Sequence, residues 1–249
     1  MTQIDMNSDL GESFGRYSLG KDKEIIQLVT SVNIACGFHA SDPDVMAKTV
    51  ALAEEAGVGI GAHPGYHDLQ GFGRRNMNLT PEEVKNLVIY QVGALQGFTS
   101  SKKLHHVKPH GALYNMAAKD YDLSVAICKA IKFVDPNLPI YALAGSETVR
   151  AAQAVGIPCA QEVFGDRNYL PDGNLVPRSE ANAVITDPIE VAAHVIEMVE
   201  TQSVTAIDGS IIPLKADSVC VHGDNAAALA IVANLRKTLQ NNKIVLQAF

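Results

Sequence analysis

Short apolar segments alternate along the chain with longer segments in which apolar residues recur every three or four positions. The short segments predict buried β-strands, and the longer segments predict amphipathic helices. The expected strands cover residues 4–7, 32–36, 58–62, 106–108, 140–143, 159–164 and 218–221. The expected helices cover residues 23–29, 43–56, 81–97, 123–133, 146–154, 188–200 and 225–239.

The ends of several expected helices carry the residues that such ends favour. Three helices begin with a proline, which the first helical turn tolerates, and each proline follows a residue able to cap the helix. These capping residues are Asp42, Thr80 and Asp187. Gly57 and Gly156 follow helical segments, as C-terminal caps do.

Seven strand–helix repeats predict parallel strands covered by helices. No change in composition divides the chain, so we expect one α/β domain over residues 1–249. A closed or nearly closed (β/α) barrel fits better than an open doubly wound sheet, because no Gly-x-Gly-x-x-Gly turn follows the first strand. Periodicity alone leaves both architectures open. Segments 168–178 and 204–214 each contain an Asp-Gly turn and predict short hairpins inserted into this framework.

Polar residues able to do chemistry collect where the expected strands end. They are Asp9, Glu12, His39, His63, Lys108, His110, Asp166, His222 and Asp224. The C-terminal ends of the strands in a parallel barrel form one face, which holds the active site. We therefore expect these side chains to meet in one pocket.

The residue types indicate what such a pocket can do. The histidines are candidate proton carriers or metal ligands. Asp9, Glu12 and Asp166 are candidate bases for activating water. Lys108 and Arg178 are candidate partners for a carboxylate or a phosphoryl group.

Structural roles compete with these assignments for each residue taken alone. Asp224 is well placed to cap the helix that follows it, and His39 can simply donate to a backbone carbonyl. Cys36 has a histidine nearby, but a small buried thiol is the simpler interpretation. The argument for a functional site depends on the joint placement of these residues.

Two motifs resemble known sites and fall short of them. His63 and His67 are four residues apart, but Pro64-Gly65 between them makes a turn, so they are not expected to share a helix face as zinc ligands do. Segment 15–22 is close to a phosphate-binding P-loop, but Asp22 stands where serine or threonine holds magnesium. The sequence therefore leaves the metal ligands undefined.

Charge and composition exclude several classes of protein. The net charge of -7 includes no basic block, so we expect no nucleic-acid partner. No apolar run reaches the length of a membrane-spanning helix, so no membrane association is expected. The first residues lack the features of a signal peptide and the four cysteines are dispersed, which predicts a cytoplasmic location.

Six motifs in order strongly resemble the LamB/YcsF family. They are DMNSDLGESFG, NIACGFHASDP, GAHPGYHDLQGFGRR, VKPHGALYN, FGDRNYLPDGNLVPR and VCVHGDN, and they extend over residues 5–225. The sequence departs from the usual pattern at Ser8, His67 and Gly165 without weakening the resemblance.

The resemblance implies a distorted TIM-like barrel of seven β/α units, of the glycoside hydrolase/deacetylase type. It implies action as the A subunit of an ATP-dependent 5-oxoprolinase, which opens the lactam of 5-oxoproline to L-glutamate while ATP is hydrolysed to ADP and phosphate. The 5-oxoprolinase subunits B and C are the implied partners. The implied cofactor is ATP, bound with a divalent metal such as magnesium, in a site that can extend into the partner subunits.

Residue roles follow as expectations from this resemblance and from the residue chemistry. The expected catalytic residues are Asp9, Glu12, His39 and His63. The expected substrate- or phosphate-binding residues are Lys108, His110, Asp166, Arg178, His222 and Asp224. Two alternatives remain open: a metal-dependent amidohydrolase or deacetylase that acts alone, and a non-catalytic component of the complex.

Overall fold

The computed structural model describes residues 2–221 and 228–249, and within these residues seven parallel strands close into a barrel. The strands are β1 (Gln3–Leu10), β2 (Ser31–Ala35), β3 (Gly59–His63), β4 (His106–Val107), β5 (Ile140–Leu143), β6 (Cys159–Phe164) and β9 (Ser218–Cys220). Each strand pairs with the next in this order, and β9 pairs with β1 to complete the ring. The predicted barrel is therefore confirmed, and the open sheet is excluded.

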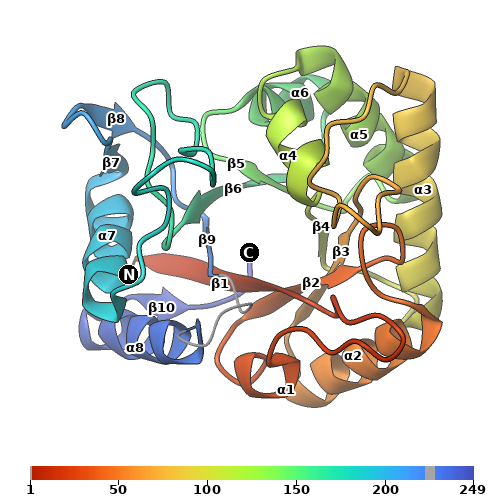
Figure 1. The fold of residues 1–249 in the computed structure, drawn as a ribbon, viewed down its shortest axis with the longest axis horizontal. Coiled ribbons are helices and arrows are strands. Elements are labelled where there is room, and N and C mark those ends of the chain that lie inside the picture. The colour runs from red at the N-terminus through yellow and green to blue at the C-terminus, as the bar shows by residue number, and fades with distance from the viewer. Residues whose placement is uncertain (1, 222–227) are drawn as a thin grey trace.

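Helices surround the ring of strands, as Figure 1 shows. They are α1 (Asp22–Ile25), α2 (Pro43–Ala56), α3 (Pro81–Phe98), α4 (Gly111–Ala117), α5 (Tyr121–Val134), α6 (Glu147–Val155), α7 (Pro188–Thr201) and α8 (Ala228–Asn241). Neighbouring helices pack in the pairs α3 with α5, α5 with α6, and α7 with α8. Among the residues described, none of these helices has both the length and the apolar character that crossing a bilayer demands.

The predicted helix ends are confirmed by their hydrogen bonds. The side chain of Asp42 accepts from two backbone amides in the first turn of α2. Thr80 and Glu83 form a reciprocal capping box at the start of α3. Gly57 and Gly156 take left-handed conformations after α2 and α6, where a residue with a side chain would be strained.

Several elements differ from the prediction. The first helix, α1, has only four residues, and α4 lies where no helix was expected. Strand β10 (Val245–Leu246) pairs with the start of β1 outside the ring. Both expected hairpins form. The first is closed by a bridge between Tyr169 and Leu175, and the second consists of β7 (Ser203–Thr205) and β8 (Ile211–Pro213).

Apolar and polar residues alternate along β2, so that the apolar ones join the surrounding core and the polar ones face the barrel interior. Val32 and Ile34 are fully buried in the hydrophobic core. Ser31 precedes Val32, and Asn33 lies between Val32 and Ile34. Both polar residues make hydrogen bonds inside the barrel. This is the period-two pattern of a strand with two different buried faces.

The interior of the barrel is polar, whereas branched aliphatic side chains usually fill such barrels. At the N-terminal end, the buried Asp5 carboxylate accepts hydrogen bonds from Ser31 and Ser218. In the middle layer, Asn7 donates to Glu162 at 2.7 Å and accepts from Asn33 at 2.7 Å. These satisfied polar layers support the residues at the C-terminal end of the barrel.

Candidate active site

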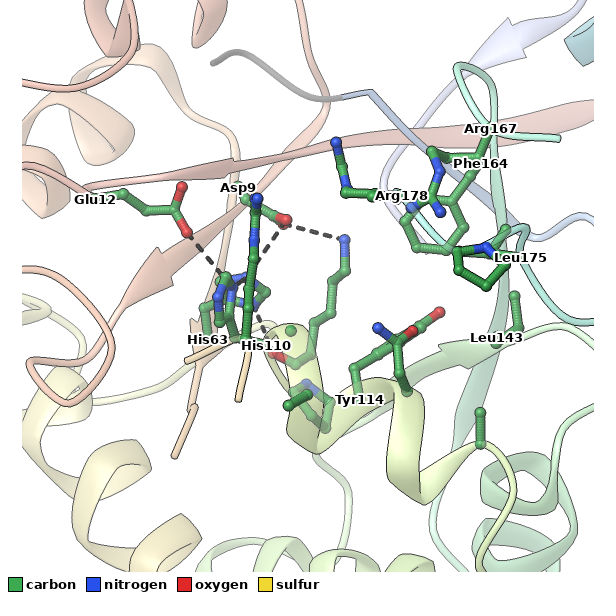
Figure 2. A pocket seen from close by; sticks show the side chains of 18 of the residues that line it. Asp9, Glu12, His63, His110, Tyr114, Leu143, Phe164, Arg167, Leu175 and Arg178 are labelled. Atoms are coloured by element: carbon green, nitrogen blue, oxygen red, sulfur yellow. Dashed lines mark hydrogen bonds and ion pairs between the residues drawn. The ribbon is translucent and has the colours of Figure 1, made fainter. Parts of the chain in front are cut away.

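A cavity of about 380 Å³ opens at the C-terminal ends of the strands. Figure 2 shows Asp9, Glu12, His63 and His110 at one side of it and Arg167 and Arg178 at the other. Its polar lining includes Asp9, Glu12, His63, Arg74, Lys108, His110, Tyr114, Arg167 and Arg178. Its apolar lining includes Leu10, Leu143, Phe164 and Leu175. Loops distant in sequence therefore meet at one end of the barrel.

Lys108 links the cavity to the polar interior of the barrel. Its Nζ atom lies 3.0 Å from a carboxylate oxygen of Asp9 and 3.0 Å from one of Glu162. The Sγ atom of Cys220 also lies 3.0 Å from this ammonium. Burial by itself lowers the pKa of Lys108, but Asp9, Cys220 and Glu162 outweigh it and hold the pKa well above its ordinary value. Lys108 is therefore a fixed cation at the base of the cavity.

Asp9 is held on both sides. Its Oδ1 accepts from Asn33 at 2.8 Å as well as from Lys108, and its Oδ2 lies 3.4 Å from Nε2 of His63. Asn33 is oriented in turn by His106, whose ring nitrogen donates to the amide oxygen of Asn33 at 2.6 Å. Asp9 thus presents a carboxylate of defined orientation to the cavity.

A glycine in β3 makes room for the His106 ring. A Cβ atom at Gly61 would lie 2.2 Å from Nε2 of His106, so any larger residue would displace the imidazole. The ring also stacks on Tyr141, with centroids 3.9 Å apart. The sequence pattern did not single out His106, because it lies at the start of β4 and not at its C-terminal end.

Three histidines and a glutamate gather beside Asp9. Nε2 of His63 and Nδ1 of His110 are 2.9 Å apart. The ring of His39 stacks on that of His110 with centroids 3.6 Å apart, and its Nε2 lies 3.2 Å from Glu12. Burial holds the pKa values of His39 and His110 well below the ordinary value for histidine, so both rings are neutral near pH 7.

This cluster has the donors that a metal ion needs. One ligand atom from each of Glu12, His39, His63 and His110 lies within 4.8 Å of the others. Gly73 allows the packing, since a Cβ atom there would lie 2.7 Å from Cβ of His39. His67 does not join the cluster. It is exposed and packs on Phe38 with ring centroids 4.7 Å apart, so the pairing of His63 with His67 does not occur.

The opposite side of the cavity is cationic. Arg167 is buried, and its guanidinium donates to the backbone carbonyls of Val176 and Ala183. Burial, and then the charge of Arg178, lower its pKa to about 10. Two arginines close enough to repel each other create a potential that attracts an anion.

Tyr114 lines the cavity and is hydrogen-bonded to Glu162, and neither residue was singled out from the sequence. The Tyr114 hydroxyl donates to Glu162 Oε2 at 2.9 Å, and both side chains are buried. Glu162 lies within β6 in an otherwise buried strand, and a charged residue at such a position is itself a signal of an interior partner.

The structure brings most of the expected site residues together. Asp9, Glu12, His39, His63, Lys108 and His110 form one connected group. Arg178 lines the cavity opposite them, and Asp166 is buried next to Arg167 without lining the cavity. His222 and Asp224 lie outside the described residues.

Segment 15–22 and Cys36 do not have the structures of the sites that they resemble in sequence. Gly15 lies in a turn that does not follow a strand directly, and the Asp22 side chain accepts from the Gly11 amide, so segment 15–22 does not form a P-loop. Cys36 is buried and donates to the Ile34 carbonyl, and burial raises its pKa to about 12. It is a core residue and not an activated nucleophile.

The fold and the site together define a (β/α)-barrel protein with a polar ligand pocket at the C-terminal strand ends. The chain belongs to the LamB/YcsF family, whose family model matches residues 4–249.

Individual relatives are similar over their whole length. The chain is 62% identical over 248 residues to the A subunit of 5-oxoprolinase from Limosilactobacillus fermentum, covering 100% of both chains. The crystal structure of the lactam utilization protein from Thermus thermophilus superposes with a TM-score of 0.94 at 43% identity, covering 99% of this chain and 100% of that one.

More distant structures share the fold only. A structure described as T48 deacetylase with substrate matches with a TM-score of 0.50 at 12% identity, over 98% of this chain and 87% of that one. Likeness at this level supports the deacetylase-type barrel and carries no information on the reaction.

Proposed function

We propose that this chain is the A subunit of an ATP-dependent 5-oxoprolinase and that its barrel pocket opens the lactam of 5-oxoproline to L-glutamate. The observation that carries this proposal is the 62% identity, over the full length of both chains, to a protein named as the A subunit of 5-oxoprolinase. The pocket supports it, because its charges complement a small molecule that has a carboxylate at one end and an amide carbonyl at the other.

The charges of the cavity suggest how the substrate lies. The carboxylate of 5-oxoproline faces Arg178 and Arg167, the cations on one side of the cavity. The lactam carbonyl then faces Lys108 and Asp9 on the other side. Leu143, Phe164 and Leu175 provide apolar contact for the ring methylenes between these two ends.

A lactam carbonyl is a poor electrophile, and ATP supplies the activation. The amide oxygen attacks the γ-phosphorus and ADP leaves, which produces a phosphorylated lactam. Water adds to the ring carbon, and the C–N bond breaks as the nitrogen takes a proton. The resulting acyl phosphate is hydrolysed by a second water molecule to the side-chain carboxylate of glutamate and inorganic phosphate.

The residues of the pocket fit separate tasks in this scheme. Asp9 accepts the proton of the attacking water, because Lys108 and Asn33 hold one of its oxygens while the other is directed to His63. Lys108 stabilises negative charge that develops on the oxygen of the carbonyl. Glu12, His39 and His63 act with Asp9 as the other catalytic residues. The substrate or the phosphoryl group is bound by the remaining assigned residues: His110, Asp166, Arg178, His222 and Asp224.

Partners and nucleotide belong to the same proposal. Subunits B and C complete the enzyme, and ATP with magnesium binds in a site that extends into them, because segment 15–22 does not supply a phosphate loop in this chain. A cytoplasmic location fits the requirement for ATP.

Reconstitution tests the proposal directly. Glutamate and phosphate release from 5-oxoproline and ATP are measured with this chain alone, with subunits B and C alone, and with all three. We expect both products in equal amounts only with all three subunits. Hydrolysis of N-acetylated sugars by the isolated chain without ATP would instead identify a stand-alone deacetylase. Full turnover without this chain would show that it is not catalytic.

A further inference from the structure

Backbone hydrogen bonds determine which ring nitrogen of His63 and of His110 carries a proton. A carbonyl oxygen only accepts hydrogen bonds. Nδ1 of His63 therefore donates to the Lys108 carbonyl at 2.7 Å, and Nε2 of His110 donates to the Phe72 carbonyl at 2.8 Å. In neutral rings, the two remaining nitrogens are unprotonated. These nitrogens are the ones that face each other at 2.9 Å, so two lone pairs point at the same place.

Such a pair of nitrogens requires a positive charge between or beside them, either a proton or a metal ion. A third donor favours the metal ion, because Oε1 of Glu12 lies 3.5 Å from Nδ1 of His110. Bonds of about 2.0–2.1 Å place the ligands of a tetrahedral ion about 3.3 Å apart and those of an octahedral ion about 2.9 Å apart. The observed separations of 2.9 Å and 3.5 Å therefore match ligands arranged around one ion.

Negative charge beside the two facing nitrogens also favours a divalent ion. The Glu12 carboxylate lies 3.5 Å from Nδ1 of His110, and an Asp9 oxygen lies 3.4 Å from Nε2 of His63. A divalent ion among these groups would attract the carboxylates more strongly than a single proton would, because the electrostatic energy grows with the charge of the cation.

His39 has a different place in the cluster. Its ring is nearly parallel to that of His110, at an interplanar angle of 4°. An ion lies near the plane of each imidazole that binds it, so one ion cannot lie in both planes. Nε2 of His39 instead donates to Glu12 at 3.2 Å and orients that carboxylate, as outer partners of metal ligands do.

We propose that Glu12, His63 and His110 bind one divalent transition-metal ion, with an open coordination position toward the cavity. All three residues line the cavity, whereas His39 is not among its described lining residues. Two imidazole nitrogens and one carboxylate favour ions such as Zn²⁺ or Co²⁺ over Mg²⁺ or Ca²⁺. Three protein ligands with one open position are typical of catalytic zinc sites. The site rests on donor geometry and charge and does not depend on the proposed function.

Metal binding is measured on the full-length chain without a polyhistidine tag, after a chelator has removed bound metal. Co²⁺ is added and its visible absorption is recorded, and Zn²⁺ binding is followed by calorimetry. We expect one equivalent of either ion per chain and a rise in the melting temperature. Mg²⁺ at the same concentration is expected to produce neither effect. Substoichiometric Co²⁺ and Zn²⁺ binding by the wild-type chain would overturn the proposal and leave a shared proton as the explanation.

Matched substitutions test the ligands. Glu12→Gln and His110→Gln are expected to weaken Zn²⁺ binding at least about tenfold, and His39→Gln to weaken it through the orientation of Glu12. His67→Gln is the control, because His67 is an exposed histidine outside the cluster. Circular dichroism of the metal-free variants verifies folding, and the wild-type stoichiometry remains decisive if a variant fails to fold. Unchanged affinity in folded Glu12→Gln and His110→Gln variants would refute the assignment.

Discussion

The ammonium of Lys108 lies 3.0 Å from the carboxylate of Asp9 at the base of the cavity, and both side chains are largely buried. This pair connects the polar interior of the barrel to the pocket, because Lys108 also contacts Glu162. The same residue therefore influences the stability of the barrel and the orientation of the proposed base.

Replacing Lys108 by methionine should destabilise the protein by about 3–5 kcal/mol, because it leaves the partner carboxylates buried without their cation. Urea unfolding followed by circular dichroism measures this change in the free energy of unfolding. Lys215→Met is the matched control. Lys215 forms a surface pair with Asp217 at 2.9 Å and is 59% exposed, so its loss should cost at most about 1 kcal/mol.

The double variant Lys108→Met/Asp9→Asn tests whether charge causes this loss. Removing the Asp9 charge relieves part of the imbalance, so the two effects should fall short of additivity by at least about 1 kcal/mol. Simple additivity would show that lost packing, and not an unpaired carboxylate, explains the effect of Lys108→Met.

Arg178→Gln should raise the KM for 5-oxoproline in the reconstituted complex by at least about tenfold with a smaller effect on kcat, because a charged hydrogen bond to the substrate carboxylate is lost. Initial rates of glutamate release give both constants. Arg150→Gln makes the same change at a surface arginine that pairs with Glu147 in α6, and it should leave both constants unchanged. A fall in kcat alone for Arg178→Gln would place Arg178 at the reacting group and not at the carboxylate.

Stability should decline as the pH falls below about 6.5, the ordinary pKa of histidine in an unfolded chain. Burial holds the pKa of His106 well below that value, so the unfolded state binds a proton that the folded state does not. The stability from neutral His106 is complete above about pH 6.5 and is lost as the pH falls toward the folded pKa.

His106→Gln should reduce the slope of unfolding free energy against pH by about 1.4 kcal/mol per pH unit in this range. Chemical unfolding of the metal-free protein between pH 5 and 7 gives the slope. The expected change corresponds to about one proton fewer taken up on unfolding. His67→Gln, at an exposed position, should leave the slope unchanged. An unchanged slope in His106→Gln would show that His106 does not contribute to the acid sensitivity.

Native protein should resist thiol reagents. Burial raises the pKa of Cys36, Cys128 and Cys159 to about 12, and that of Cys220 well above the ordinary value. At pH 8 a thiol with such a pKa reacts on the order of a thousandfold more slowly than a free cysteine. Labelling with Ellman's reagent, before and after denaturation, measures this. Rapid labelling of Cys36 in the native protein would restore it as a candidate nucleophile.

Much of the fold could be predicted because short segments that contain apolar residues alternate with helices whose ends carry capping residues. The expected bounds of β5 and β6 coincide with the observed ones. Strand β10 has two residues and α4 has seven, and neither is long enough to establish a periodicity. These elements form because tertiary contacts stabilise them.

Only those site residues that lie at or after the C-terminal ends of strands could be predicted from the sequence. Asp9, His63 and Lys108 follow this rule and meet in space. Glu162 and Tyr114 lie within regular elements, and nothing in the linear pattern shows that they face the same interior. The histidines were candidate metal ligands from the sequence, but the ligand set of the proposed metal site could not be foreseen. The tautomers of His63 and His110 depend on carbonyl groups that only the folded backbone brings close.

The most direct test of the central claim is the rate of glutamate release by the reconstituted complex that contains Asp9→Asn. We expect turnover to fall at least about a hundredfold, the usual effect of losing a general base, while the three subunits still assemble. Asp208→Asn, in the exposed turn between β7 and β8, makes the same chemical change far from the pocket and should retain full activity. Wild-type turnover by the assembled Asp9→Asn complex would contradict the claim that this pocket opens the lactam.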